Sequence, residues 1–316
     1  MNIIVLSLLL LFFTLSSAHA AECVYINSYH VGYAWSDKLE HALKRELQGQ
    51  CNLHTFYMDT KRHPDATFAE KKAMEAKALI EQVKPDVVIA SDDNASKYLV
   101  APYYKNSPTP FVFCGINWTA DAYDYPYANA TGMIEVSPIK DLLYEARMTL
   151  KEVRSVAFIA VRGMRTDEKE FEWMARIYAR EGVIVTPLYV QNMQEWEQAY
   201  SQAQASDLIV LNNIAGLADW NHAEAVRYIL QHSHQLTVTT YDFMAPYTIL
   251  AMTKLAEEQG EWAGQVAIHL LHGDQPSSIP VVANRHYNLY LNETILATTA
   301  LQILPFTRFN AIKVQP

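Results

Sequence analysis

The sequence is poor in glycine and lacks the short motifs that mark most phosphate-binding and catalytic loops. Only ten of its 316 residues are glycine, and the patterns G-x-G-x-x-G, G-x-x-x-x-G-K-[ST], G-x-S-x-G and H-E-x-x-H do not occur. In these patterns glycine lets the backbone approach a phosphate or turn sharply, and paired histidines hold zinc. Their absence argues against an enzyme, so we predict no catalytic residue and no cofactor.

Basic residues are also in short supply. The chain has 25 Lys and Arg against 34 Asp and Glu, a formal net charge of -9. No basic stripe exists to neutralise phosphates, which argues against nucleic acid and against docking on an anionic membrane surface.

The sequence contains few candidate ligands for a metal ion. No C-x-x-C pattern occurs, and the pair His232 and His234 follows a predicted helix at a surface turn, where solvated histidines are the simpler interpretation. Asp92 and Asp93 could be a carboxylate dyad, but adjacent loop residues usually point apart and one commonly caps the next helix. We therefore predict no metal site.

Beyond the N-terminus, no segment approaches the 18 apolar residues of a membrane span. The apolar run Ile3–Leu15, followed by Ala18-His19-Ala20, predicts a signal peptide over residues 1–20, cleaved before Ala21. An uncleaved anchor is the alternative, although the run is short for a bilayer. Glu22 before Cys23 excludes a lipoprotein signal. The prediction is an exported protein located in the periplasm.

Only three cysteines are present. Cys23 and Cys51 each begin a predicted strand, and neighbouring parallel strands begin at the same sheet edge, so a disulfide between them is compatible with the geometry but not required by it. Cys114 lies in an apolar run and is predicted to be a buried free thiol.

What the chain does contain is a regular alternation of short apolar runs with amphipathic helical stretches. Such alternation predicts parallel sheets covered by helices on both faces. Two sets occur, and in the second a helix is predicted to open at Ser137-Pro138, with Ser137 as its cap. The predicted strands cover 24–27, 53–58, 87–90, 111–114 and 131–135, then 155–160, 183–189, 207–211 and 236–240. We predict the α/β class, with two doubly wound parallel-sheet lobes joined by crossover strands.

The C-terminal tail does not form a third set, so we expect it to return and complete both lobes. The predicted first lobe comprises residues 21–135 plus 243–275. The predicted second lobe comprises residues 136–242 plus 276–316, which include the tail.

Hydrogen-bonding, charged and aromatic side chains follow the predicted strands. Ligands of open α/β sheets bind outside the carboxyl ends of the strands, and such a mixture suits one small molecule. Each residue also has a structural interpretation: Asp92 could cap a helix, Trp35 could be core, and Arg162 could be a surface charge. The candidate ligand-binding residues are Ser28, Tyr29, His30, Trp35, Asp92, Asp93, Asn117, Trp118, Arg162, Asn213 and Asp242.

Several segments in order resemble the substrate-binding components of uncharacterised ABC transport systems, in the type I periplasmic-binding-protein superfamily. The segments are 84–90 (KPDVVIA), 110–117 (PFVFCGIN), 130–135 (ATGMIE) and 272–276 (HGDQP). The segment 28–35 (SYHVGYAW) is similar to a subgroup also found as sensor regions of signalling proteins. The chain departs from the family in lacking a lipobox and in having Asn212-Asn213 where relatives often have Asp-Asn.

The resemblance implies two lobes joined by three crossover strands, with a small-molecule solute between them and an ABC permease in the inner membrane as partner. Better-described relatives bind aromatic amino acids. Acidic residues among the candidates favour an amino acid or related amine, held by a monomer. A ligand-sensing accessory of a histidine kinase or diguanylate cyclase is the alternative function, and an enzyme of this fold class is a further one.

Overall fold

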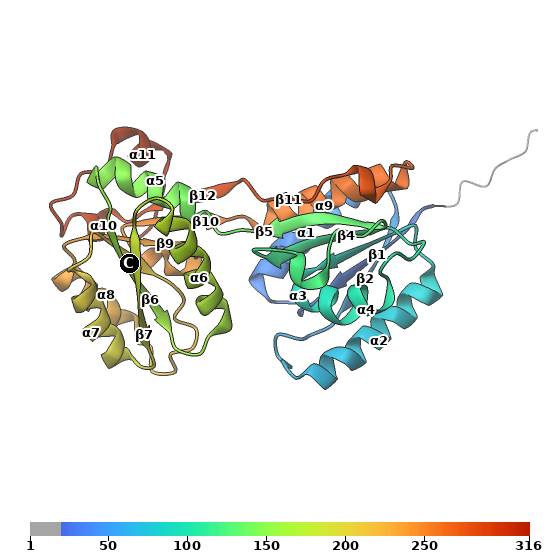
Figure 1. Ribbon diagram of the computed structural model, residues 1–316, viewed down its shortest axis with the longest axis horizontal. Helices are drawn as coiled ribbons and strands as arrows, with labels where there is room; N and C mark the ends of the chain where they lie inside the picture. The colour runs from blue at the N-terminus through green and yellow to red at the C-terminus, as the bar shows by residue number, and fades with distance from the viewer. Residues whose placement is uncertain (1–19) are drawn as a thin grey trace, which may run out of the picture.

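The computed structural model describes residues 20–316, so the predicted signal peptide lies almost wholly outside the described residues. Two lobes are visible, each a sheet with helices on its faces, and several segments run between them along one side (Figure 1). The alternation of apolar strands and amphipathic helices predicted this arrangement, and the prediction is confirmed.

The first lobe is built on a six-stranded sheet in the order β11-β5-β4-β3-β1-β2, with every neighbouring pair parallel. Its central strand β3 is buried along its whole length, as expected from the unbroken apolar run VVIA that precedes Ser91. The strands are β1 (Glu22–Asn27), β2 (Asn52–Tyr57), β3 (Val87–Ser91), β4 (Phe111–Asn117), β5 (Ala130–Glu135) and β11 (Val282–Ala283).

The second lobe has a seven-stranded sheet in the order β13-β12-β10-β9-β8-β6-β7. All neighbours are parallel except β10 and β12, which run antiparallel. The strands are β6 (Ser155–Val161), β7 (Ile184–Val190), β8 (Leu208–Leu211), β9 (Leu236–Thr239), β10 (Leu250–Lys254), β12 (Tyr287–Leu291) and β13 (Ile312–Lys313).

Helices cover both sheets, and their apolar stripes form the cores beneath them. Those of the first lobe are α1 (Ala34–Leu47), α2 (Ala66–Val83), α3 (Asp92–Ala95), α4 (Ala101–Tyr103) and α9 (Ala256–Leu271). Those of the second are α5 (Ile139–Leu150), α6 (Arg165–Ala179), α7 (Met193–Ala203), α8 (His222–His232), α10 (Glu293–Leu296) and α11 (Pro305–Asn310).

Helix α9 comes late in the chain yet packs against α1 in the first lobe (Figure 1). Two of the few glycines make this contact close. A Cβ atom on Gly260 would lie 2.1 Å from the carbonyl oxygen of Leu39, and one on Gly264 would lie 2.6 Å from Cβ of Glu46. Any larger residue at either position would push the two helices apart.

The described chain passes between the sheets three times. It crosses after β5 at residues 136–138, between β10 and α9 at Leu255, and between β11 and β12 at residues 284–286. Each expected lobe range therefore contains a strand that pairs in the sheet of the other lobe. β10 lies within 243–275 but pairs in the second sheet, and β11 lies within 276–316 but pairs in the first. The short strands β11 and β13 each pair with one neighbouring strand, and a local sequence pattern does not reveal this pairing.

Three local predictions meet different outcomes. Cys23 and Cys51 form a disulfide with their Cα atoms 5.9 Å apart, and Cys114 is a buried free thiol. The predicted cap of α5 is wrong: Pro138 occupies the cap position, and no side chain caps the helix. The hydroxyl of Ser137 instead donates to Glu170 at 2.9 Å, because this buried carboxylate needs donors.

Candidate functional site

Asp92 stands at the centre of the candidate site, directly after β3. It is 2% exposed, it adopts a φ of +68°, and its Oδ2 is buried without a hydrogen-bond partner among residues 20–316. Burial, followed by the negative charges of Glu135 and Asp93, raises the pKa of Asp92 well above its usual range. A left-handed, buried and unpaired carboxyl group is costly to maintain, and such features concentrate at functional sites.

Two tyrosines lie near Asp92. Tyr29 and Tyr33 pack edge to face with ring centroids 5.1 Å apart, and the ammonium of Lys61 lies 5.2 and 5.1 Å from the two ring centres. Burial, then the charges of Asp92 and Glu135, raises the pKa of Tyr33 to about 12. The pair therefore presents neutral aromatic rings that already accept a cation.

A buried ion pair joins the lobes beside this cluster. Lys254 at the end of β10 contacts Glu135 at the end of β5, with Nζ 2.5 Å from Oε1 and side chains only 10% and 8% exposed. The same ammonium lies 5.9 Å from the ring centre of Trp35 and 6.0 Å from that of Tyr241. Burial opposes the charge of Lys254, but the carboxylates of Glu135 and Glu170 outweigh it and raise the pKa of Lys254.

The second lobe contributes two buried carboxylates on α6. Glu170 accepts hydrogen bonds from Ser137 and from Thr240, at 2.9 and 3.2 Å. Asp167 accepts from the amide of Val161 at 3.4 Å and lies against Asn212. Burial raises the pKa of Asp167 to about 6, against the lowering effect of these hydrogen bonds.

Several predicted site residues are already saturated by partners within the protein. Ser28 donates to the carbonyl of Ser91 and accepts from the amide of Ala95. Asp93 accepts from the side-chain amide of Asn117 at 3.1 Å and from the hydroxyl of Tyr123 at 2.7 Å. These bonds fix the loops after β1, β3 and β4, so these side chains position the site.

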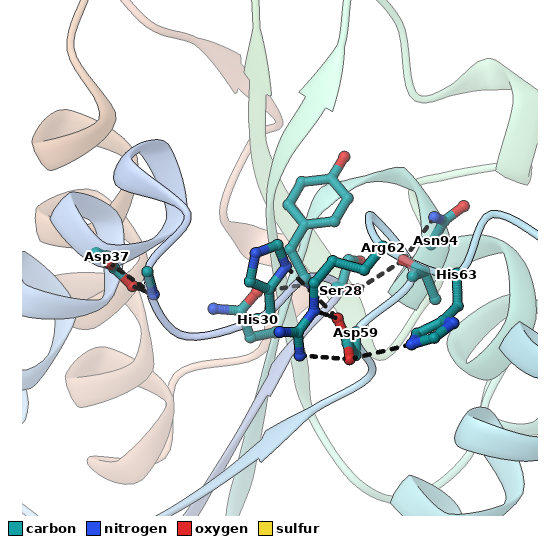
Figure 2. Close-up of polar contacts among 11 residues, drawn as sticks. Ser28, His30, Asp37, Asp59, Arg62, His63 and Asn94 are labelled. Atoms are coloured by element: carbon teal, nitrogen blue, oxygen red, sulfur yellow. Dashed lines mark hydrogen bonds and ion pairs between the residues drawn. The ribbon is translucent and has the colours of Figure 1, made fainter.

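His30 takes part in a cluster of charges around Asp59 (Figure 2). Both guanidinium nitrogens of Arg62 that face Asp59 donate to its carboxylate at 2.7 and 2.6 Å, while His30 and His63 lie 3.5 and 3.7 Å from it. Hydrogen bonds from Arg62 hold the pKa of Asp59 below its usual range. The cluster pins the loop that follows β2 beside the loop that carries Tyr29.

The second-lobe candidates are more exposed. Arg162 donates to the carbonyl of Tyr189 on the neighbouring strand at 3.2 Å, and Asn213 accepts from Ala215 in its own turn at 2.8 Å. Asp242 is about half exposed and lies 3.8 Å from Lys38 on α1 of the first lobe. It therefore contacts the opposite lobe.

Trp118 adjoins the ion pair through its backbone, because its amide donates to the carbonyl of Glu135 at 2.8 Å. With a φ of +68° and 6% exposure, it stacks on Trp173 of α6, with ring centroids 5.3 Å apart and an interplanar angle of 8°. Lys169 of the same helix donates to the backbone carbonyl of Asn117 at 2.8 Å. These contacts form a second bridge between the lobes.

The site residues that the sequence did not indicate are those brought into the site by the crossovers between the lobes. Glu135 ends a predicted strand, but Lys254 ends a strand that was not predicted, and Tyr33, Glu170 and Tyr241 were not singled out. A signal existed for two of them: Glu135 is the last residue of a predicted apolar strand and Tyr241 immediately follows another, and position at the end of a strand is the rule that selected Asp92.

The described residues contain neither a metal-holding cluster nor a membrane-spanning helix. No group of three or more His, Cys, Asp or Glu side chains in residues 20–316 is arranged to hold a metal ion. Nor is any helix in this part of the chain long and apolar enough to cross a membrane.

Comparison with known families decides the classification. The model of the ABC transporter substrate binding protein family matches residues 57–306. The chain belongs to this family. No curated protein is similar enough in sequence to count as a match.

Solved structures agree on the fold. The ligand-free, open structure of a substrate binding protein with adhesive properties from Clostridium difficile matches with a TM-score of 0.70 and 12% identity, covering 94% of this chain and 99% of that chain. An ABC domain in complex with L-Trp from Streptococcus pneumonia matches with a TM-score of 0.63 and 13% identity, covering 94% and 100%. A conserved domain protein from Vibrio cholerae matches with 0.64 and 15%, covering 93% and 99%. The fold is that of the type I periplasmic binding proteins.

Proposed function

We propose that this protein captures a small solute carrying an amino group between its two lobes in the periplasm, as a monomer, and presents it to an ABC permease of the inner membrane. The observation that carries the solute class is Asp92. Its buried carboxyl group lacks one hydrogen-bonding partner, and an ammonium group would supply the missing donor together with the compensating charge.

The surroundings favour an amine with an apolar body. Tyr29 and Tyr33 offer rings near Asp92, and an ammonium over an aromatic face is attracted by the ring quadrupole. Trp35 offers a further ring next to Lys254. Asp242 and Arg162 of the second lobe would reach the solute when the lobes close by a hinge motion. Binding of L-Trp by the streptococcal relative is compatible with this class.

Thermal shift of the solute-free mature protein tests the proposal. The protein is unfolded and refolded to remove carried-over ligand, then screened against amino acids, amines, sugars, nucleosides and purines. A solute at one hundred times its dissociation constant stabilises by about 2.7 kcal/mol, which raises Tm by several degrees. A shift confined to amine-bearing compounds supports the proposal, whereas a shift confined to sugars would refute the amine assignment.

Asp242→Ala then tests whether the second lobe contributes to solute binding, and Asp219→Ala is the control on the same lobe. Loss of affinity in the first variant and not in the second is expected. Unchanged affinity in Asp242→Ala would remove this residue from the proposed site.

A further inference from the structure

A cavity of about 300 Å³ lies where the chain crosses between the lobes, lined by residues other than the Asp92 cluster. Its walls come from two crossovers, residues 136–138 and 284–286, and from the start of α5 and the inner side of α6. Figure 1 shows α6 on the side of the second lobe that faces the first. The cavity is at the lower end of the volume range of small-molecule sites.

One wall of this hinge cavity is aromatic. The stacked pair Trp118 and Trp173 lines it, and Tyr287 at the start of β12 lies on its rim. Arg176 covers Trp173, with its guanidinium carbon 4.8 Å from the ring centre, and this holds the indole in place. Trp173 is thus held between Trp118 and Arg176, and the wall is rigid and apolar, which suits an aromatic ligand.

The polar side of the cavity carries two unpaired cations. Lys140 and Arg285 both line it, and neither side chain has an ion-pair or hydrogen-bonding partner within residues 20–316. Asp141 is the one carboxylate in the lining, and His286 is the remaining titratable nitrogen. With histidine neutral, the balance is two positive charges against one negative charge.

The backbone around Arg285 is fixed by hydrogen bonds to Glu258. The amides of Arg285 and His286 donate to the two carboxylate oxygens of Glu258 on α9, at 2.8 and 2.9 Å. Glu258 is 8% exposed, so this is a buried anchor for the crossover. Its carboxylate is occupied by backbone donors, and the guanidinium of Arg285 stays available to a ligand.

We propose that the hinge cavity is a second binding site, separate from the solute site, which takes a planar aromatic carboxylate. The ring would lie against Trp118 and Trp173, and the carboxylate would meet Arg285 and Lys140. Because both lobes contribute walls, an occupant would favour this arrangement of the lobes.

Calorimetric titration of solute-free mature protein with indole-3-acetate tests the proposal, with the neutral indole-3-acetamide as the matched compound. We expect saturable binding of the acid and at least tenfold weaker binding of the amide. The double variant Lys140→Gln, Arg285→Gln should bind the acid at least tenfold more weakly than the wild type. Both side chains are exposed and unpaired, so the variant should keep its Tm.

Arg180→Gln is the matched control, because Arg180 is an exposed cation on the second lobe that does not line the cavity and whose side chain has no partner among the described residues. Binding should be unchanged in this variant. Absence of saturable binding by the wild type overturns the proposal. So does binding that survives in the double variant but is lost in Tyr29→Ala, because the acid would then occupy the solute site.

Discussion

Replacing Asp92 with Asn should make the solute-free protein more stable and the solute complex weaker. The native carboxyl group is buried with one oxygen unpaired, and its pKa is raised by burial and by Glu135 and Asp93. Asn keeps the shape and tolerates the left-handed backbone, as Asp does. The substitution removes the charge and replaces one acceptor oxygen with an NH2 donor group.

The magnitude follows from the charge, because an unsatisfied buried group costs about 1–3 kcal/mol when neutral and more when charged, and Asn replaces the charged group with a neutral one. We therefore expect Asp92→Asn to raise the free energy of unfolding by about 1–3 kcal/mol at pH 8. The sign depends on pH. A folded-state pKa above the usual 3.8 means that the native state binds the proton more tightly than the unfolded state, so wild-type stability falls as pH rises above 3.8. The difference in the free energy of unfolding between variant and wild type should therefore vanish below pH 3.8 and grow above it.

Urea denaturation of the solute-free protein between pH 3.5 and 8 measures this gap. Asp93→Asn is the control of opposite sign, because the carboxylate of Asp93 accepts from Asn117 and Tyr123, and an amide nitrogen there would face a donor. We expect it to lose about 1–3 kcal/mol. If Asp92→Asn unfolds at lower urea than the wild type at pH 8, the unpaired carboxylate does not destabilise the fold.

The same substitution should weaken binding of an amine-bearing solute. Hydrogen bonds to charged groups contribute about 1.5–3 kcal/mol, which corresponds to about 10–150-fold in Kd. A gain in stability with a loss of affinity is the signature of a site that is maintained at a cost to the fold. Unchanged affinity for the solute found in the thermal screen would remove Asp92 from the binding site.

Three further predictions test the framework around the site. Lys254→Met should lower the free energy of unfolding by about 3–5 kcal/mol because Glu135 is left buried without its partner, and adding Glu135→Gln should restore most of the loss in urea denaturation. Cys51→Ser opens a disulfide that spans 28 residues, so it should cost about 3–4 kcal/mol, and reductant should destabilise the wild type but not the variant. Asp167 has a pKa raised to about 6, so wild-type stability should fall between pH 4 and 6 by up to about 3 kcal/mol. Asp167→Asn should remove that part of the pH dependence; an unaltered profile would contradict it.

The fold was predictable because its signals are local. A strand buried on both faces, such as β3, is an unbroken apolar run, and a helix beside it shows a 3.6-residue stripe. The tail was less predictable for the same reason. β11 and β13 are two residues long, and each is defined by the one strand it pairs with, β5 or β12, which no local pattern encodes.

The candidate site shows where sequence reasoning stops. Position after a strand selected Ser28, Asp92, Asp93 and Asn117 alike, since carboxyl ends of parallel strands meet at one edge. What separates them is the set of hydrogen bonds that each makes to residues distant in sequence. Ser28 is satisfied across 63 and 67 positions, and Asp93 across 24 and 30, whereas one oxygen of Asp92 stays unpaired. A residue type at a strand end therefore predicts where a ligand binds, but only the partners supplied by the rest of the fold determine which side chain has bonding capacity left for that ligand.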